Sequence, residues 1–96
     1  MEAAPAIAVR VVVSGRVQGV WYRGWTADEA RRRGLRGWVR NRADGTVEAL
    51  FAGPEDQVRA MIAACHDGPP AARVAEVAEF PGSDRGGTEF QQLPSL

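Results

Sequence analysis

The segment VSGRVQGVWYR, residues 13–23, joins a run of β-branched residues to a segment of helical composition. A loop between a strand and a helix N-terminus exposes several backbone N–H groups, and Gly15 and Gly19 allow the backbone to curl so that these groups converge. The helix start adds partial positive charge, and Arg23 can hold a phosphate through two parallel hydrogen bonds. The segment therefore predicts a cradle for one small tetrahedral anion, with a purely structural strand-to-helix turn as the alternative.

This cradle differs from the loops that bind nucleotides. The sequence contains no GxxxxGK[ST] motif and no lysine, since all twelve basic residues are arginine. The dinucleotide fingerprint GxGxxG is also absent. The predicted ligand is therefore a small anion and not a nucleotide.

Strand and helix signals extend outward from the loop. Residues 7–13 are rich in β-branched types and predict a buried strand, and residues 14–20 form the turn. A helix is expected from Tyr22 to about Arg33, with Gly34 as its C-terminal stop. Its buried face is predicted from the residues that recur every four positions, Tyr22, Thr26 and Ala30.

A hairpin follows, with strands at 35–41 and 46–52 joined by turn residues 42–45, where Asp44-Gly45 supplies the positive φ. Pro54 favours the start of a second helix. The apolar stripe of that helix consists of Val58, Met61, Ile62 and Cys65.

Residues 67–70 end the second helix, and residues 72–80 predict a strand. Within that strand Val74 and Val77 are three positions apart, so a bulge is expected to shift the buried face. Residues 88–93 predict a short last strand. The order strand, helix, strand, strand, helix, strand is the split βαβ plan, in which two helices cover one face of a sheet.

Length and composition predict one small domain over residues 1–96. The single cysteine, Cys65, cannot form an internal disulfide. No stretch of about 18 apolar residues predicts a membrane span. Arg10 interrupts the apolar N-terminal run, which therefore predicts a first strand and not a signal peptide. We expect a soluble, cytoplasmic protein.

The formal net charge is zero, but the charge is unevenly distributed. Residues 1–42 hold nine arginines and three acidic residues, whereas residues 43–96 hold three arginines and nine acidic residues. A basic half can present an anion site. The exclusive use of arginine is also what a GC-rich coding bias produces.

Several separated motifs resemble the acylphosphatase family. They are VSGRVQGVWYR at 13–23, GLRGWVRNRADGTVEA at 34–49 and GPPAARV at 68–74, and the resemblance runs from about residue 8 to residue 80, more weakly through Phe90. It implies the same α+β fold as the element order: a ferredoxin-like α/β sandwich, βαββαβ with a short extra C-terminal strand. Two helices would lie on one face of a mixed, mainly antiparallel sheet.

The resemblance also implies an activity, hydrolysis of the carboxyl–phosphate bond of acyl phosphates by a positioned water. The implied catalytic residues are Arg23 and Asn41, and the implied partners are a small-molecule acyl phosphate and inorganic phosphate. No covalent intermediate, metal or cofactor is implied, and we expect a monomer that binds no nucleic acid. The phosphoryl oxygens would be held by the backbone amides of Arg16, Val17, Gln18, Gly19, Val20 and Trp21.

One departure from the family pattern lies at the site itself. Trp21-Tyr22 stands where other members carry smaller or different apolar residues, which predicts an altered pocket mouth or acyl preference. Outside the site, Arg33 stands where many members place an apolar helix residue.

Other residues favour structural roles. His66 is predicted at the surface and Cys65 in the core, and Arg31–Arg33 predict a solvated helix face. Trp38 is expected to pack on the sheet face opposite to Asn41, because the two are an odd number of residues apart in one strand.

The alternative function is a non-catalytic anion- or RNA-binding module with the same fold. RGWVRNRA at 36–43 begins like an RNP1 motif, but it lacks the later aromatics and lies in the second strand instead of the third. A sequence pI near 6.6 also disfavours RNA binding. Asn41 distinguishes an enzyme from a sensor, because a sensor needs no positioned water.

Overall fold

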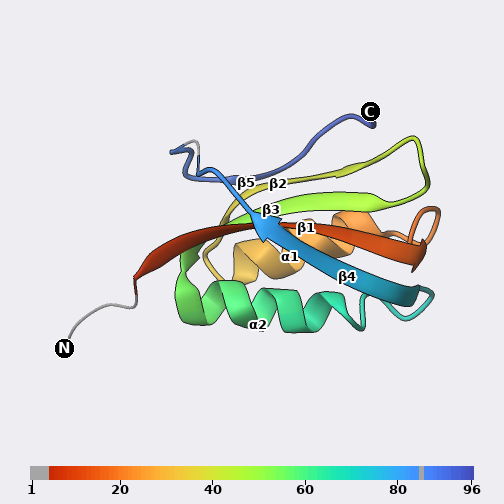
Figure 1. The fold of residues 1–96 in the computed structure, drawn as a ribbon, viewed down its shortest axis with the longest axis horizontal. Helices are drawn as coiled ribbons and strands as arrows, with labels where there is room; N and C mark the ends of the chain where they lie inside the picture. Colours follow the sequence, from red (N-terminus) through yellow and green to blue (C-terminus); the bar gives the residue numbers. More distant parts are fainter. Residues whose placement is uncertain (1–4, 85) are drawn as a thin grey trace.

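The computed structural model describes residues 5–84 and 86–96. The elements within them follow the predicted order, and Figure 1 shows them along the chain. They are β1 (Ala6–Arg16), α1 (Tyr22–Arg32), β2 (Arg36–Asn41), β3 (Val47–Pro54), α2 (Glu55–Cys65), β4 (Arg73–Pro81) and β5 (Phe90–Gln92).

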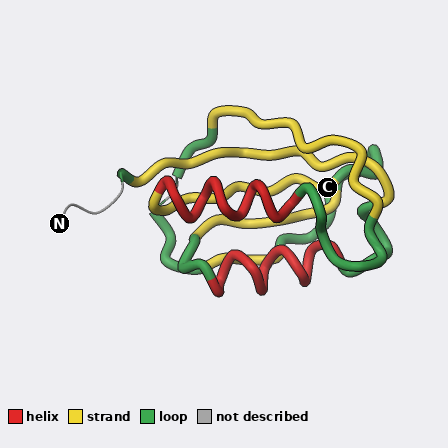
Figure 2. Tube along the Cα trace, turned by 90° about the horizontal axis from the view of Figure 1, so that it is seen from below, coloured by secondary structure: helices red, strands yellow, loops and turns green. Residues whose placement is uncertain are grey.

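The strands form one sheet in the order β4-β1-β3-β2-β5. The pairs β1–β3, β1–β4 and β2–β3 are antiparallel, and β5 runs parallel to β2. Both helices lie against the same face of this sheet (Figure 2). The predicted ferredoxin-like sandwich, mixed sheet and short C-terminal strand are therefore confirmed.

The first strand is longer than the sequence predicts. Residues 14–16 were expected to form the start of the turn, but Ser14, Gly15 and Arg16 continue β1 because they pair with β4. The register shifts between Ser14 and Gly15, which pair with Glu76 and Val74 and leave Ala75 as the extra residue. The predicted bulge is thus confirmed.

The core lies between the sheet and the helices. Val9, Val11 and Val13 alternate along β1 toward the helices, and the predicted stripe of α2, including Cys65, is buried against them. The Tyr22 hydroxyl donates a hydrogen bond to the Cys65 backbone oxygen at 2.7 Å. This bond joins the first turn of α1 to the last turn of α2 and so fixes where α1 begins.

The other face of the sheet is open and carries paired charges. Glu48 is only 7% exposed and lies between Arg10 and Arg40, at 3.0 and 2.9 Å. Trp38 is partly buried on this face, below the Arg40 guanidinium, whose carbon is 4.8 Å from the ring centroid.

Two further predictions concern the helix surfaces. The three arginines at the end of α1 pair with Asp28 and Glu29, and the predicted surface residue His66 is exposed. Neither helix in the part of the chain that the structure describes is long and apolar enough to cross a membrane.

Candidate active site

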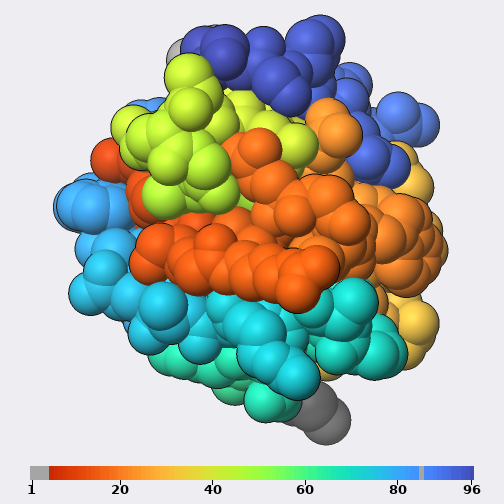
Figure 3. Space-filling model, turned by 90° about the vertical axis from the view of Figure 1, so that its right-hand side faces the viewer, coloured from red at the N-terminus to blue at the C-terminus, as the bar shows by residue number. Residues whose placement is uncertain are grey.

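The predicted anion loop lies at one end of the molecule, between two other connections. Figure 3 looks onto this end: the loop after β1 (orange) lies between the β2–β3 hairpin (yellow-green) and the segment from α2 to β4 (teal to cyan). Contacts on both sides support this arrangement. The Gln18 side chain bonds to the hairpin, and a Cβ on Gly68 would lie 2.7 Å from the Tyr22 ring.

A small cavity of about 150 Å³ opens beside the loop. It brings together Arg23 and Asn41, the two residues predicted to be catalytic. The full lining is Val17, Gln18, Gly19, Trp21, Tyr22, Arg23, Gly24, Asn41 and Gln92.

Two residues of the predicted phosphate loop do not line the cavity. Arg16 is the last residue of β1, and Val20 is buried in the core. The other predicted loop positions, Val17, Gln18, Gly19 and Trp21, do line it.

The loop leaves a run of backbone donors without a protein acceptor. Among residues 5–84 and 86–96, none of the six N–H groups from Gln18 to Arg23 donates a hydrogen bond. The first bond of α1 is donated by the Trp25 N–H to the Trp21 oxygen at 3.0 Å. Such free N–H groups at a helix start carry partial positive charge and attract anions.

Arg23 is a partly buried arginine that lines the cavity. Eight of the arginines in the described residues pair with a carboxylate within 4.0 Å, and Arg23 is not among them. Within the described residues, a guanidinium without a carboxylate partner therefore lines the same cavity as a loop with free N–H groups, which favours a positive potential there. The geometry suits an anion with several oxygens.

The Gln18 side chain connects the loop to the strand that carries Asn41. Its Nε2 donates to the backbone oxygens of Arg42 and Thr46, both at 2.9 Å. Asn41 is the last residue of β2 and lines the cavity, whereas Trp38 lines a hollow on the open face. The predicted opposition of these two side chains is confirmed.

Sequence reasoning missed two lining residues, Gln92 and Gly24. Gln92 reaches the cavity because β5 pairs with β2 in parallel, with Gln92 opposite Val39. Nothing in the local sequence indicates that partner strand. Gly24 could have been found from its place one residue after Arg23, in the first turn of α1.

Burial keeps two neighbouring ionisable side chains protonated: Tyr22, which lines the cavity, and Cys65, whose backbone oxygen the Tyr22 hydroxyl contacts. Burial raises the pKa of Tyr22, whose hydroxyl is already committed to the Cys65 oxygen. Burial also raises the pKa of the Cys65 thiol to about 12, so it stays protonated and unreactive at neutral pH. Neither group can serve as an acid or a nucleophile for a ligand in the cavity.

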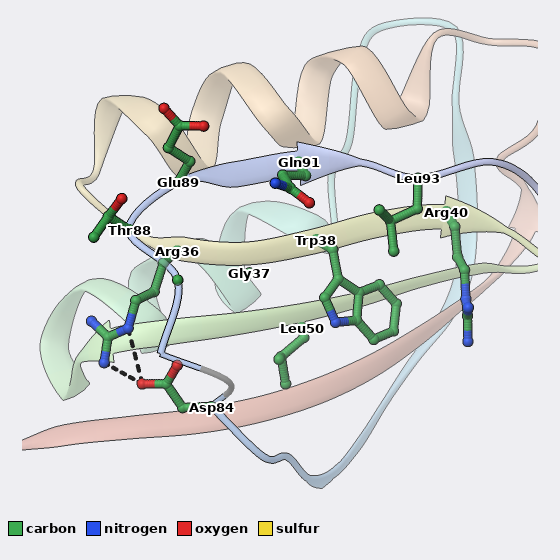
Figure 4. Close-up of a pocket in the computed structure, with 11 residues that line it drawn as sticks. Arg36, Gly37, Trp38, Arg40, Leu50, Asp84, Thr88, Glu89, Gln91 and Leu93 are labelled. Carbon is green, nitrogen blue, oxygen red and sulfur yellow. Dashed lines mark hydrogen bonds and ion pairs between the residues drawn. The ribbon is translucent and has the colours of Figure 1, made fainter.

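A larger hollow of about 420 Å³ lies on the open sheet face (Figure 4). The Arg36 guanidinium closes one end by pairing with Asp84, and this hydrogen bond lowers the pKa of the Asp84 carboxyl. Trp38, Leu50 and Leu93 form its apolar part. Its arginines, Arg36 and Arg40, are both ion-paired, so the hollow offers no free cation. No group of three metal-ligating side chains occurs in the described residues.

Comparison with known proteins gives one family. The family model for acylphosphatase matches residues 9–92. An acylphosphatase of Rhodospirillum rubrum is 59% identical over 86 residues, which cover 90% of this chain and 94% of that protein. The crystal structure of acylphosphatase from Bacillus subtilis superposes with a TM-score of 0.87 at 38% identity, covering 91% of this chain and 98% of that one. The structure of an acylphosphatase from Coxiella burnetii superposes with a TM-score of 0.87 at 31% identity, covering 92% of this chain and 93% of that one.

Proposed function

This chain belongs to the acylphosphatase family, whose known activity is the hydrolysis of acyl phosphates, and we propose that Arg23 and Asn41 are its catalytic residues. The reaction consumes one water and releases a carboxylate and inorganic phosphate. The observation that carries the proposal is the run of free N–H groups from Gln18 to Arg23, beside an unpaired guanidinium in one cavity.

The phosphoryl group would be held by Arg23 and by those predicted loop amides that have no protein acceptor, from Gln18 to Trp21. Phosphoryl transfer has a loose transition state with charge spread over the equatorial oxygens, so positioning and charge stabilisation supply most of the catalysis. The planar guanidinium matches two phosphoryl oxygens at once. The N–H groups are fixed by the backbone, so little reorganisation is needed when charge develops.

The cavity contains no group suited to protonate a leaving group. Its lining includes no aspartate, glutamate or histidine, and the Tyr22 hydroxyl is bound to a carbonyl. An acyl phosphate does not need such an acid, because its leaving group is a weakly basic carboxylate. An alkyl phosphate releases a strongly basic alkoxide and does need one. The lining therefore supports selectivity for acyl phosphates.

Asn41 would hold the attacking water. Its side-chain amide both donates and accepts hydrogen bonds, and its backbone oxygen accepts the Leu96 N–H at 3.1 Å, which helps to fix the end of β2. Since no lining side chain is available as a nucleophile, the water attacks phosphorus directly and no covalent intermediate forms. A water held in line with the leaving oxygen gains the rate advantage of a positioned reactant.

Phosphate release from acetyl phosphate, with an alkyl phosphate monoester as the control, tests this function. We expect turnover of the first and almost none of the second, and the same rates after exhaustive chelation, because no carboxylate lines the cavity to hold Mg²⁺. Comparable rates on both substrates would contradict the mechanism. In a parallel titration with inorganic phosphate, the amide signals of residues 16–23 should shift most.

We also propose that the enzyme acts as a monomer and binds no nucleic acid. Arg23 and Asn41, the two proposed catalytic residues, line the same cavity of one chain, so the proposed mechanism needs no residue from a second copy. Size-exclusion chromatography at assay concentration tests the first statement. A low-salt RNA-binding assay tests the second, since nonspecific binding is strongest at low salt.

A further inference from the structure

Trp21 adopts a backbone conformation that is unfavourable for its residue type. Its φ is 67°, and it is the one non-glycine residue with positive φ in the part of the chain described. A bulky residue in the left-handed region is strained, and such strain clusters at functional sites. Glycine would fit the same position without strain. The side chain at this position therefore needs a separate explanation.

The indole is held at the cavity mouth and does not belong to the core. Trp21 lines the cavity together with Arg23 and Asn41, yet it is 63% exposed. A Cβ added to Gly24 would lie 2.1 Å from the indole Nε1 and 2.6 Å from Cε2. The ring thus rests against the backbone of the first turn of α1, in the space that a side chain on Gly24 would fill.

The chemistry of the site decides what such a ring can contact. The free N–H groups and Arg23 attract the phosphoryl end of a ligand, and the cavity of about 150 Å³ leaves little further room. The acyl end of a bound acyl phosphate must then extend toward the mouth. Trp21 is the largest apolar side chain that lines the cavity, and part of its surface is open.

We propose that Trp21 is a platform for the acyl group, so that this enzyme prefers acyl phosphates with a flat aromatic acyl group over acetyl phosphate. The proposal rests on the function proposed above, because it assumes that the phosphoryl group occupies the loop. Aromatic rings stack on an indole in an offset or edge-to-face arrangement, and acetyl is too small to do so. Burial of an exposed indole by the acyl group would also remove apolar surface from water.

The test compares kcat/KM for benzoyl phosphate and acetyl phosphate in the native enzyme and in Trp21→Gly. Glycine adopts φ 67° without strain, so this variant removes the ring and keeps the loop. We expect the preference for benzoyl phosphate to fall roughly five- to tenfold, the range of an aromatic contact. The inhibition constant of inorganic phosphate is measured in both proteins, so that any change in the loop amides is separated from the loss of the ring. Trp21→Phe should restore part of the preference.

Gly24→Ala provides an independent test, because a methyl group there must displace the indole without removing it. Alone, it should reduce the benzoyl preference as Trp21→Gly does. In the Trp21→Gly background it should have no further effect, since no ring remains to be displaced. Full additivity of the two changes would contradict the contact.

Three outcomes separate this proposal from the function on which it rests. If the native enzyme hydrolyses neither acyl phosphate, the proposed function fails. If it hydrolyses both and Trp21→Gly leaves their ratio unchanged, the platform alone is wrong. Succinyl phosphate carries a second carboxylate that butyryl phosphate lacks, so this pair tests recognition by charge. The platform would also be wrong if the preference for succinyl phosphate were larger than the preference for benzoyl phosphate and remained in Trp21→Gly.

Discussion

The cavity at the loop and the hollow around Trp38 on the open sheet face differ in size and in the state of their charges. The hollow on the open sheet face is the larger, about 420 Å³ against about 150 Å³, and its arginines are already paired with carboxylates. The smaller cavity at the loop holds Arg23, which has no carboxylate partner among the described residues, and a run of free N–H groups. Unsatisfied positive charge, not volume, is therefore the feature that sets the proposed phosphate site apart from this hollow.

The difference also explains why the loop cavity can be small. A phosphoryl group is compact and needs several donors around it, whereas an open hollow spreads its few polar groups over a wide wall. The predictions below apply matched changes to the two hollows. Three of the changes remove a group that lines the loop cavity, and two of these have a chemically similar control on the open face. The fourth removes a group of the open-face hollow itself.

Arg23→Ala should have the largest effect. It removes the cation proposed to contact the phosphoryl group in the ground state and the transition state, so phosphate affinity and kcat should both fall, with kcat lower by on the order of 10³-fold. Arg23→Lys should retain only part of the native kcat and phosphate affinity, since an ammonium cannot make the planar two-point contact. The measurements are turnover of acetyl phosphate and titration with inorganic phosphate. Equal losses in Arg36→Ala, the open-face control, would abolish the distinction between the hollows.

Asn41→Ala should lower kcat by about 100-fold, the scale expected when a reacting water is misplaced. Phosphate affinity should stay close to native, because Asn41 contacts the water. The control is Gln91→Ala, which removes an amide from the open-face hollow and should leave turnover unchanged. Near-native turnover in a folded Asn41→Ala protein, verified by circular dichroism, would contradict the role of Asn41.

Gln18→Ala should weaken phosphate binding by about tenfold. The change removes two hydrogen bonds that hold the loop to the hairpin, each contributing about 1 kcal/mol, while the carbonyls keep their hairpin partners Gly45 and Arg42. Isothermal titration with phosphate measures the loss. The two lost hydrogen bonds together should lower the thermal midpoint by roughly 10 °C. Native affinity in this variant would show that the loop is ordered without its tie to the hairpin.

Arg36→Ala should have the smallest effect on activity, within twofold. Its consequence is local: the Asp84 pKa should rise toward its ordinary value, because the hydrogen bond that lowers it is lost. The ion pair stabilises the fold while Asp84 is ionised. The native protein should therefore be more stable than Arg36→Ala at neutral pH, and this difference in stability should disappear as pH falls through the lowered Asp84 pKa. Carboxyl NMR titration measures the shift, and an unchanged Asp84 titration would contradict it.

The sequence allowed the fold and most of the site to be predicted because those signals are local. The loop motif identifies Arg23, Gly19 and the start of α1 from neighbours in the chain. The Val74–Val77 spacing even indicated the bulge in β4. Apart from Gly24, the misses depend on tertiary contacts. The Gln18 amide bonds to carbonyls 24 and 28 residues away, and Gln92 depends on a strand partner that no local pattern specifies.

The Gln18 side chain also limits how this chain can be re-engineered. The tip of the β2–β3 hairpin, Asp44-Gly45, is exposed and looks like a natural place to graft a peptide. One amide nitrogen, however, spans the carbonyls on both sides of that turn, at Arg42 and Thr46. An insertion that separates these two carbonyls detaches the loop from the hairpin. The segment around Gly86 and Gly87, where an added Cβ on either residue meets nothing within 4 Å, is the better graft point.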